Sequence, residues 1–116
     1  MKAIEFGFKG AGMLRNGSTV RFENDGFLVH DVTAIRVKNA REAKALTALV
    51  VAGKDNKAEK LATGFSQFAG PLSPGAVQQF TLHVKPGVYV IASFLDTQDG
   101  REQTRLGMER TIRIVK

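Results

Sequence analysis

Residues 86–115, PGVYVIASFLDTQDGREQTRLGMERTIRIV, decide the fold of this chain. Val88–Phe94 is an apolar, β-branched run after a Pro-Gly turn, which predicts a buried strand. In Arg110–Val115 apolar and polar residues alternate, which predicts a strand with one exposed face. A polar loop, 96–107, joins the two strands. The stretch therefore predicts the closing hairpin of a β-rich fold.

This hairpin resembles the copper-loop end of the cupredoxins, the plastocyanin- and azurin-like proteins. The family pattern has a Tyr in the first strand, a Cys four residues later, a His in the loop, and Gly-Met before the last strand. Tyr89 and the pair Gly107-Met108 match that pattern. Ser93 stands at the Cys position and Gln103 at the loop-His position.

Upstream segments extend the resemblance over nearly the whole chain. The Asn-Asp-Gly segment 24–26, followed by His30, is similar to the family segment that carries the first copper ligand. A helical insert followed by 70–75 (GPLSPG) and 84–89 (VKPGVY) is similar to a bacterial plastocyanin-like subgroup. The resemblance implies a mainly β fold, a cupredoxin-like Greek-key β-sandwich of about seven strands, in a single domain, 1–116.

In the cupredoxins this site holds type 1 copper with two imidazoles, a thiolate and a long Met contact, and it transfers single electrons. The resemblance makes His30, Ser93, Gln103 and Met108 the equivalents of the four ligands. A Ser hydroxyl is a hard, protonated donor, and Gln offers an amide oxygen where an imidazole nitrogen is needed. One imidazole and one thioether are too few to hold Cu(II) tightly. We therefore expect a vestigial metal site, no cofactor, and no catalytic residue.

The rest of the chain carries further strand patterns. The expected strands are Ile4–Phe8, Ser18–Asn24, Phe27–Val37 and Val77–Val84. Phe27–Val37 is apolar on both faces, which favours a central position in a sheet. Short strands separated by turn residues predict a two-sheet sandwich.

A helical insert is expected near residues 39–62. Asn39 has a Glu three residues later, as in a capping box, and Gly53 follows an amphipathic run and is expected to end the helix. A second helical piece is expected at 57–62. The segment 64–70 (GFSQFAG) is expected to be a loop whose two Phe pack onto the sandwich edge.

Composition excludes several classes of function. The chain has no cysteine, which excludes disulfides, zinc-thiolate sites and cysteine nucleophiles. The net charge is +6, but the basic residues are scattered and not interleaved with aromatics, so no nucleic-acid interface is expected. No apolar run is long enough for a membrane span.

Several residues have two interpretations. His30 is either a copper ligand or a buried histidine that hydrogen-bonds to the backbone, and Met108 is either an axial ligand or a core residue. A hydrolytic Ser93–His30 pair is disfavoured because no third orienting residue is evident. The carboxylates of the 96–102 loop lack the spacing of a calcium loop, which favours a solvated turn.

The sequence predicts a binding or accessory module that is not an enzyme, and the resemblance alone places it in the periplasm or outside the cell. A protein partner is expected at the loop end near Arg101, Arg105 and Met108; scattered surface charge is the alternative interpretation. The alternative function is copper carriage or electron transfer through His30 and Met108, with Met13 or a second molecule as a further ligand.

Overall fold

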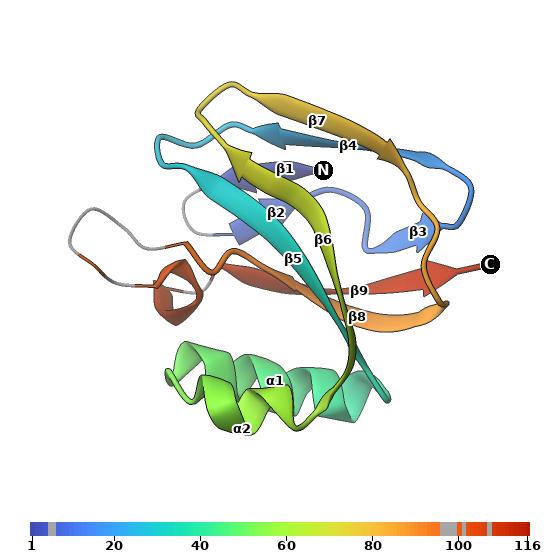
Figure 1. Ribbon diagram of the computed structural model, residues 1–116, viewed down its shortest axis with the longest axis vertical. Helices are drawn as coiled ribbons and strands as arrows, with labels where there is room; N and C mark the ends of the chain where they lie inside the picture. The colour runs from blue at the N-terminus through green and yellow to red at the C-terminus, as the bar shows by residue number, and fades with distance from the viewer. Residues whose placement is uncertain (5–6, 96–99, 101, 107) are drawn as a thin grey trace.

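The computed structural model describes residues 1–4, 7–95, 100, 102–106 (for 105 the backbone alone) and 108–116 (Figure 1). The elements of the described residues, in chain order, are β1 (Lys2–Ile4), β2 (Gly7–Lys9), β3 (Met13–Arg15), β4 (Thr19–Asn24), β5 (His30–Val37), α1 (Ala40–Val51), α2 (Asp55–Glu59), β6 (Ala62–Leu72), β7 (Val77–Thr81), β8 (Gly87–Ala92), the 3₁₀ helix Gln103–Leu106, and β9 (Glu109–Val115). None of the helices among these residues is long and apolar enough to cross a membrane.

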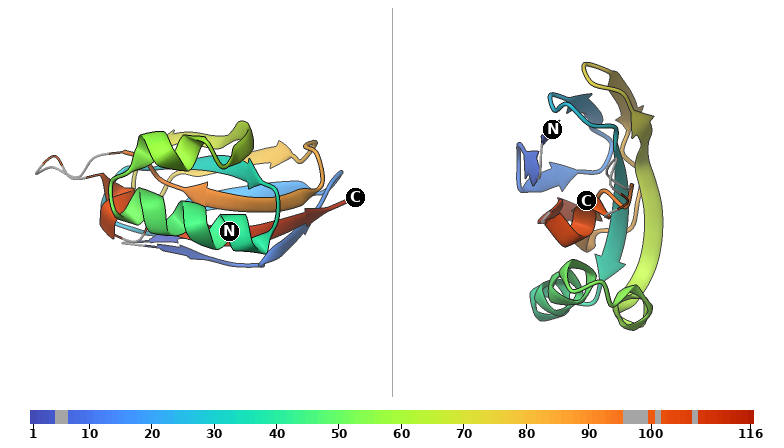
Figure 2. Two further views of the ribbon diagram at one scale, coloured as in Figure 1. Left: turned by 90° about the horizontal axis from the view of Figure 1, so that it is seen from below. Right: turned by 90° about the vertical axis from the view of Figure 1, so that its left-hand side faces the viewer.

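The strands form two sheets packed as a sandwich. One sheet has the order β2-β1-β4-β7 and the other has the order β3-β9-β8-β5-β6. The pairs β1–β4 and β3–β9 are parallel, whereas the remaining pairs are antiparallel. Figure 2 shows both helices along one side of the five-stranded sheet, away from β4 and β7. The predicted β-sandwich with a helical insert is therefore confirmed.

Two separate cores cover the five-stranded sheet. The sandwich interior contains an aromatic cluster of Phe22, Phe68, Phe80 and Tyr89, whose ring centroids lie 5.4 to 6.4 Å apart. The second core lies between the sheet and the helices, and its buried members are Ile35, Val37, Ala43, Leu46, Val50, Ala58 and Val90. Burial from both sides explains why β5 is apolar on both faces, as its sequence predicted.

The helical insert follows its local signals. The side chain of Asn39 accepts a hydrogen bond from the Glu42 amide at 2.9 Å, which caps α1 as predicted. Gly53 has a φ of 75° just after the helix, a conformation that glycine adopts without a Cβ clash. The second helix is shorter and earlier than expected, since α2 ends at Glu59 and β6 begins at Ala62.

Three sequence predictions are wrong. Residues 64–70 are not a loop but the middle of β6, an edge strand held by its pairing with β5. Pairing with a neighbouring strand overrides the weak strand propensity of its glycines. Of its two aromatic residues, Phe68 is buried but Phe65 is exposed.

The first expected strand, Ile4–Phe8, is instead two strands, β1 and β2, which pair antiparallel with Ile4 opposite Gly7. The expected strand Phe27–Val37 begins only at His30, and the segment before it carries an almost fully exposed Phe27. The described residues form nine strands where about seven were expected, because the first expected strand is divided into β1 and β2 and because β3 and β6 were not expected as strands.

Candidate functional site

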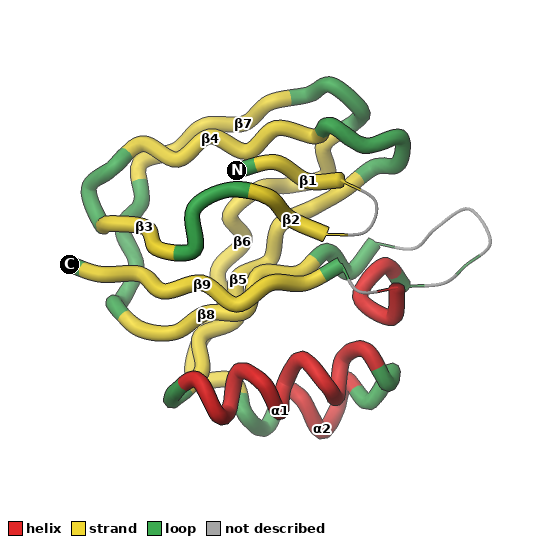
Figure 3. The backbone as a smooth tube through the Cα atoms, turned by 180° about the vertical axis from the view of Figure 1, so that it is seen from behind, coloured by secondary structure: helices red, strands yellow, loops and turns green. Residues whose placement is uncertain are grey.

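The structure brings the four predicted metal-site residues to one end of the sandwich. His30 begins β5, Ser93 follows β8, Gln103 begins the 3₁₀ helix, and Met108 precedes β9. All four are fully buried, with 0% of their surface exposed. Figure 3 shows the 3₁₀ helix next to the ends of β8 and β9, where these segments meet. We call His30, Asp31, Ser93, Gln103 and Met108 the His30 cluster.

A short hydrogen bond joins the side chains of His30 and Gln103 in this cluster. His30 Nδ1 lies 2.6 Å from Gln103 Oε1, and Gln103 Nε2 donates to the Val29 carbonyl at 2.8 Å. Because a carbonyl oxygen can only accept, the amide nitrogen of Gln103 must face Val29, so its oxygen faces His30. His30 Nδ1 therefore carries a proton and donates it. The ring nitrogen that faces Gln103 therefore has no free lone pair.

Backbone hydrogen bonds tie the other members to the same hairpin. The Met108 amide donates to the Gln103 carbonyl at 3.1 Å, and the Ser93 amide donates to the Met108 carbonyl at 3.1 Å. The Gln103 amide donates to the Leu95 carbonyl at 3.0 Å. The 3₁₀ helix is thus attached on both sides to the strands that carry Ser93 and Met108, which fixes where the Gln103 side chain projects.

The sequence analysis missed Asp31. Its side chain is buried, its Oδ1 accepts from the Phe94 amide at 3.0 Å, and its own amide donates to Ser93 Oγ at 3.2 Å. These two bonds lock the end of β8 to the start of β5. The sequence did contain a signal, because Asp31 is a charged residue in an otherwise apolar strand. A charged side chain at such a position is rarely buried without a partner.

The turn before His30 is built on Asn24, which is fully buried. Its Nδ2 donates to the Leu28 carbonyl at 2.8 Å and to the Leu72 carbonyl at 2.7 Å. Its Oδ1 accepts from the Gly26 amide at 2.9 Å, as in an Asx-turn. One side chain therefore holds the 24–28 turn against the end of β6 and positions the segment that leads to His30.

The donor set of the His30 cluster does not fit type 1 copper. The thiolate is missing because the chain has no cysteine, and Ser93 Oγ accepts a backbone N–H. The Gln103 oxygen is engaged by His30 Nδ1–H. Within the described part of the chain, no group of three or more His, Cys, Asp or Glu is placed to hold a metal ion. A soft, charged ligand is what such a site needs to hold copper in both redox states.

The loop end of the sandwich is described only in part. Residues 96–99 and 101 and the side chain of residue 105 lie outside the described residues, so the expected partner contacts at Arg101 and Arg105 and the calcium-loop interpretation lie there too. Met108, the third residue of that expected contact, is fully buried. Two apolar side chains next to the His30 cluster are exposed, Phe27 at 92% and Val29 at 42%.

Comparisons with known proteins give likeness to solved structures alone. No protein-family model matches the chain, and no curated protein matches it. Sodium-dithionite-reduced auracyanin from the photosynthetic bacterium Roseiflexus castenholzii is 15% identical, with a TM-score of 0.49 over 97% of this chain and 96% of that one. A purple cupredoxin from Nitrosopumilus maritimus is 13% identical, with a TM-score of 0.46 over 97% of this chain and 96% of that one. Likenesses this weak carry no inference about chemistry.

Proposed function

We propose that this chain is a cupredoxin-like binding module of the cell envelope that neither holds type 1 copper nor transfers electrons. The observation that carries the proposal is the donor set: the chain has no cysteine to supply a thiolate, and the buried His30 and Gln103 side chains are hydrogen-bonded to each other at 2.6 Å. The ring nitrogen that faces Gln103 offers no lone pair to a metal between these two residues, because it donates to an amide that is itself anchored at Val29. The imidazole acts as a structural donor at the position where the family resemblance expects a metal ligand.

The surface above the cluster supports a binding role. Phe27 and Val29 are exposed apolar side chains on the segment that Asn24 and Gln103 hold in place. Exposed aromatic residues on a rigid support are typical anchors of protein–protein contacts. We propose that a protein partner binds at this loop end, with Phe27 as the anchor residue.

Copper titration tests the absence of redox chemistry. We expect the wild-type protein to develop no intense thiolate-to-copper colour and to show no rise in melting temperature when copper is added. A metal that binds only the folded state at 100 times its Kd would stabilise the protein by about 2.7 kcal/mol, a shift that thermal unfolding resolves easily. Copper-dependent stabilisation that disappears in both His30→Gln and Met108→Leu would instead establish the alternative, a copper-binding protein.

A gain-of-function variant tests the assignment of the positions. Ser93→Cys combined with Gln103→His supplies the thiolate and the second imidazole, and we expect this double variant to bind copper with a blue or purple colour. Ser93→Cys alone is the matched control, because it retains the Gln103 bond to His30 and lacks the second imidazole. A folded double variant that stays colourless with copper would show that these positions do not form a ligand set.

A further inference from the structure

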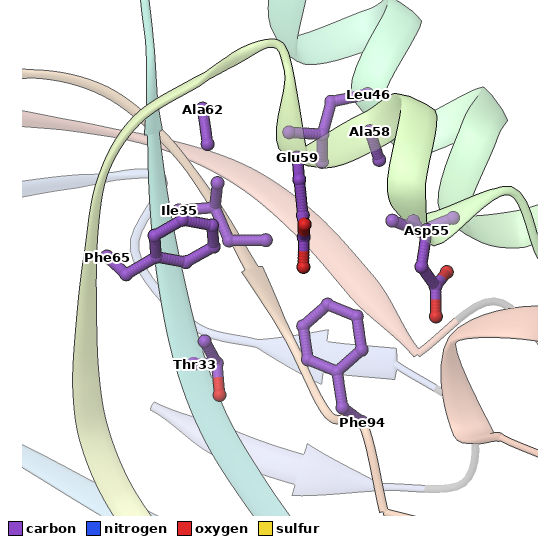
Figure 4. Close-up of a pocket in the computed structure, with 10 residues that line it drawn as sticks. Thr33, Ile35, Leu46, Asp55, Ala58, Glu59, Ala62, Phe65 and Phe94 are labelled. Carbon is purple, nitrogen blue, oxygen red and sulfur yellow. The ribbon is translucent and has the colours of Figure 1, made fainter.

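A cavity of about 250 Å³ lies between the helices and the face of the five-stranded sheet that they cover (Figure 4). Its wall is mostly apolar and includes Ile35, Leu46, Phe65 and Phe94. A dry apolar cavity of about 150 Å³ is enough for benzene, so this space fits a molecule of roughly eight to twelve non-hydrogen atoms. The cavity is partly open, which gives a small molecule a way in.

Two carboxylates of α2 line this apolar space. Figure 4 shows the Asp55 and Glu59 side chains descending from α2 toward Phe94, with the Glu59 carboxylate between Ile35 and Phe94. Asp55 Oδ1 is buried and accepts no hydrogen bond from any described residue. A buried carboxylate oxygen without a donor costs free energy, so the site favours anything that brings a donor to it.

No described basic side chain neutralises these carboxylates. The ion pairs within 4.0 Å among the described residues are Lys2–Asp25 and Arg21–Glu23, both far along the chain from α2. The lysines of the α2 region are exposed, and none of them lines the cavity. The chain as a whole is positively charged, yet this cavity presents negative charge in an apolar surrounding.

We propose that this cavity binds a small organic cation, a primary amine with an aromatic or branched aliphatic body. The ammonium group pairs with the Asp55 and Glu59 carboxylates in the cavity wall, and the apolar body packs against Ile35, Leu46 and Phe94. A charged donor at a partly desolvated carboxylate forms a stronger hydrogen bond than a neutral one does. The cavity therefore selects an amine over an alcohol of the same shape and rejects a carboxylate.

This site is separate from the proposed function at the His30 cluster. The cavity lies on the helix side of the sheet, whereas His30, Gln103 and Met108 lie at the end of the sandwich. Phe94 connects them, since its ring lines the cavity and its amide donates to Asp31 Oδ1. Loss of amine binding would leave the copper titration unchanged, so the two proposals fail independently.

A titration with 2-phenylethylamine at neutral pH, followed by amide and methyl NMR shifts, tests the proposal on the full chain. For a ligand of this size we expect a Kd of about 1 mM or tighter. The shifts should concentrate at Ile35, Leu46, Val50 and Phe94. The uncharged 2-phenylethanol should bind roughly tenfold more weakly, and phenylacetate should not bind.

Two variants locate the site. Asp55→Asn should weaken amine binding roughly tenfold and reduce the preference over the alcohol, while Ala62→Leu, which fills the wall, should abolish binding. Glu23→Gln is the matched control, because it removes a carboxylate outside the cavity and should leave the Kd unchanged. Each variant is checked for an unaltered circular dichroism spectrum. Equal affinity for amine and alcohol, shifts outside the cavity, or no binding of the amine would overturn the proposal.

Discussion

Two regions of the molecule, the loop end of the sandwich and the helix-side cavity, treat buried polar groups in opposite ways. At the sandwich end, Asn24 and Gln103 are fully buried and each makes hydrogen bonds through both side-chain polar atoms. On the helix side, Asp55 Oδ1 is buried and has no donor among the described residues. Satisfied networks make a buried region rigid, whereas an unsatisfied carboxylate stores unfavourable free energy.

The contrast separates two roles that burial alone would not distinguish. The polar side chains of the His30 cluster hydrogen-bond to one another and to the backbone, so they stabilise the fold. The helix-side cavity keeps a carboxylate oxygen that no described residue satisfies. Measurements of stability can test this distinction, because substitutions at the loop end should cause large losses and those in the helix-side cavity almost none.

The largest effect is expected for Asn24→Ala. The substitution removes the two hydrogen bonds from Nδ2 to the Leu28 and Leu72 carbonyls and the bond from the Gly26 amide to Oδ1, so we expect the free energy of unfolding to fall by roughly 3 to 5 kcal/mol. Urea denaturation measures this. Asn56→Ala, at an exposed position in α2, is the control and should change stability by less than about 0.5 kcal/mol. Similar losses for the two variants would contradict the role given to Asn24.

A smaller effect is expected for Tyr89→Phe in the sandwich core. The Tyr89 hydroxyl donates to the Lys85 carbonyl at 2.6 Å, and its loss should cost about 1 to 1.5 kcal/mol at neutral pH. Burial raises the pKa of Tyr89 above its ordinary 10.0, although the nearby Arg36 opposes this.

The raised pKa predicts the direction of a pH dependence. Between pH 10.0 and the raised value, the folded state keeps the phenol proton while the unfolded state has lost it, so stability falls as the pH rises. Urea unfolding of the wild type at about pH 8 and about pH 11 should show this loss, and the Tyr89→Phe protein should lack that share of it. A stability difference between the two proteins that grows above pH 10 would reverse the sign and contradict the assignment.

Local signals in the sequence account for the parts of the fold that were predicted correctly. Asn39 and Gly53 act through their own backbone neighbourhood, so their patterns were sufficient to place α1. The alternation in β9 likewise predicted its buried face, which carries Ile112 and Ile114. Strand β6 was missed because its glycines weaken the local pattern, while its pairing with β5 depends on residues far away in the chain.

The candidate site, like the fold, could be predicted only in part from the sequence. The family resemblance selected His30, Ser93, Gln103 and Met108; in the structure all four are buried, and hydrogen bonds link His30 to Gln103, Gln103 to Met108 and Met108 to Ser93. Spacing could not show that His30 Nδ1 carries a proton, because that follows from the orientation of the Gln103 amide against Val29. The cavity near Asp55 was not predicted at all, since its walls come from two strands, two helices and Phe94.

The smallest effect, and the one that most sharpens the contrast, is expected for Asp55→Asn without any ligand. Replacing a carboxylate oxygen that is buried and has no donor among the described residues should favour folding, while losing a negative charge in the first turn of α2 should oppose it by about 0.3 to 1 kcal/mol. We therefore expect a net change between a loss of about 0.5 and a gain of about 1 kcal/mol in urea unfolding, against the large loss at Asn24. Glu59→Gln, which changes the more exposed carboxylate, is the matched control. A loss above about 2 kcal/mol in Asp55→Asn would mean that this carboxylate stabilises the fold, and the loop end and the helix-side cavity would then not differ in how they use buried polar groups.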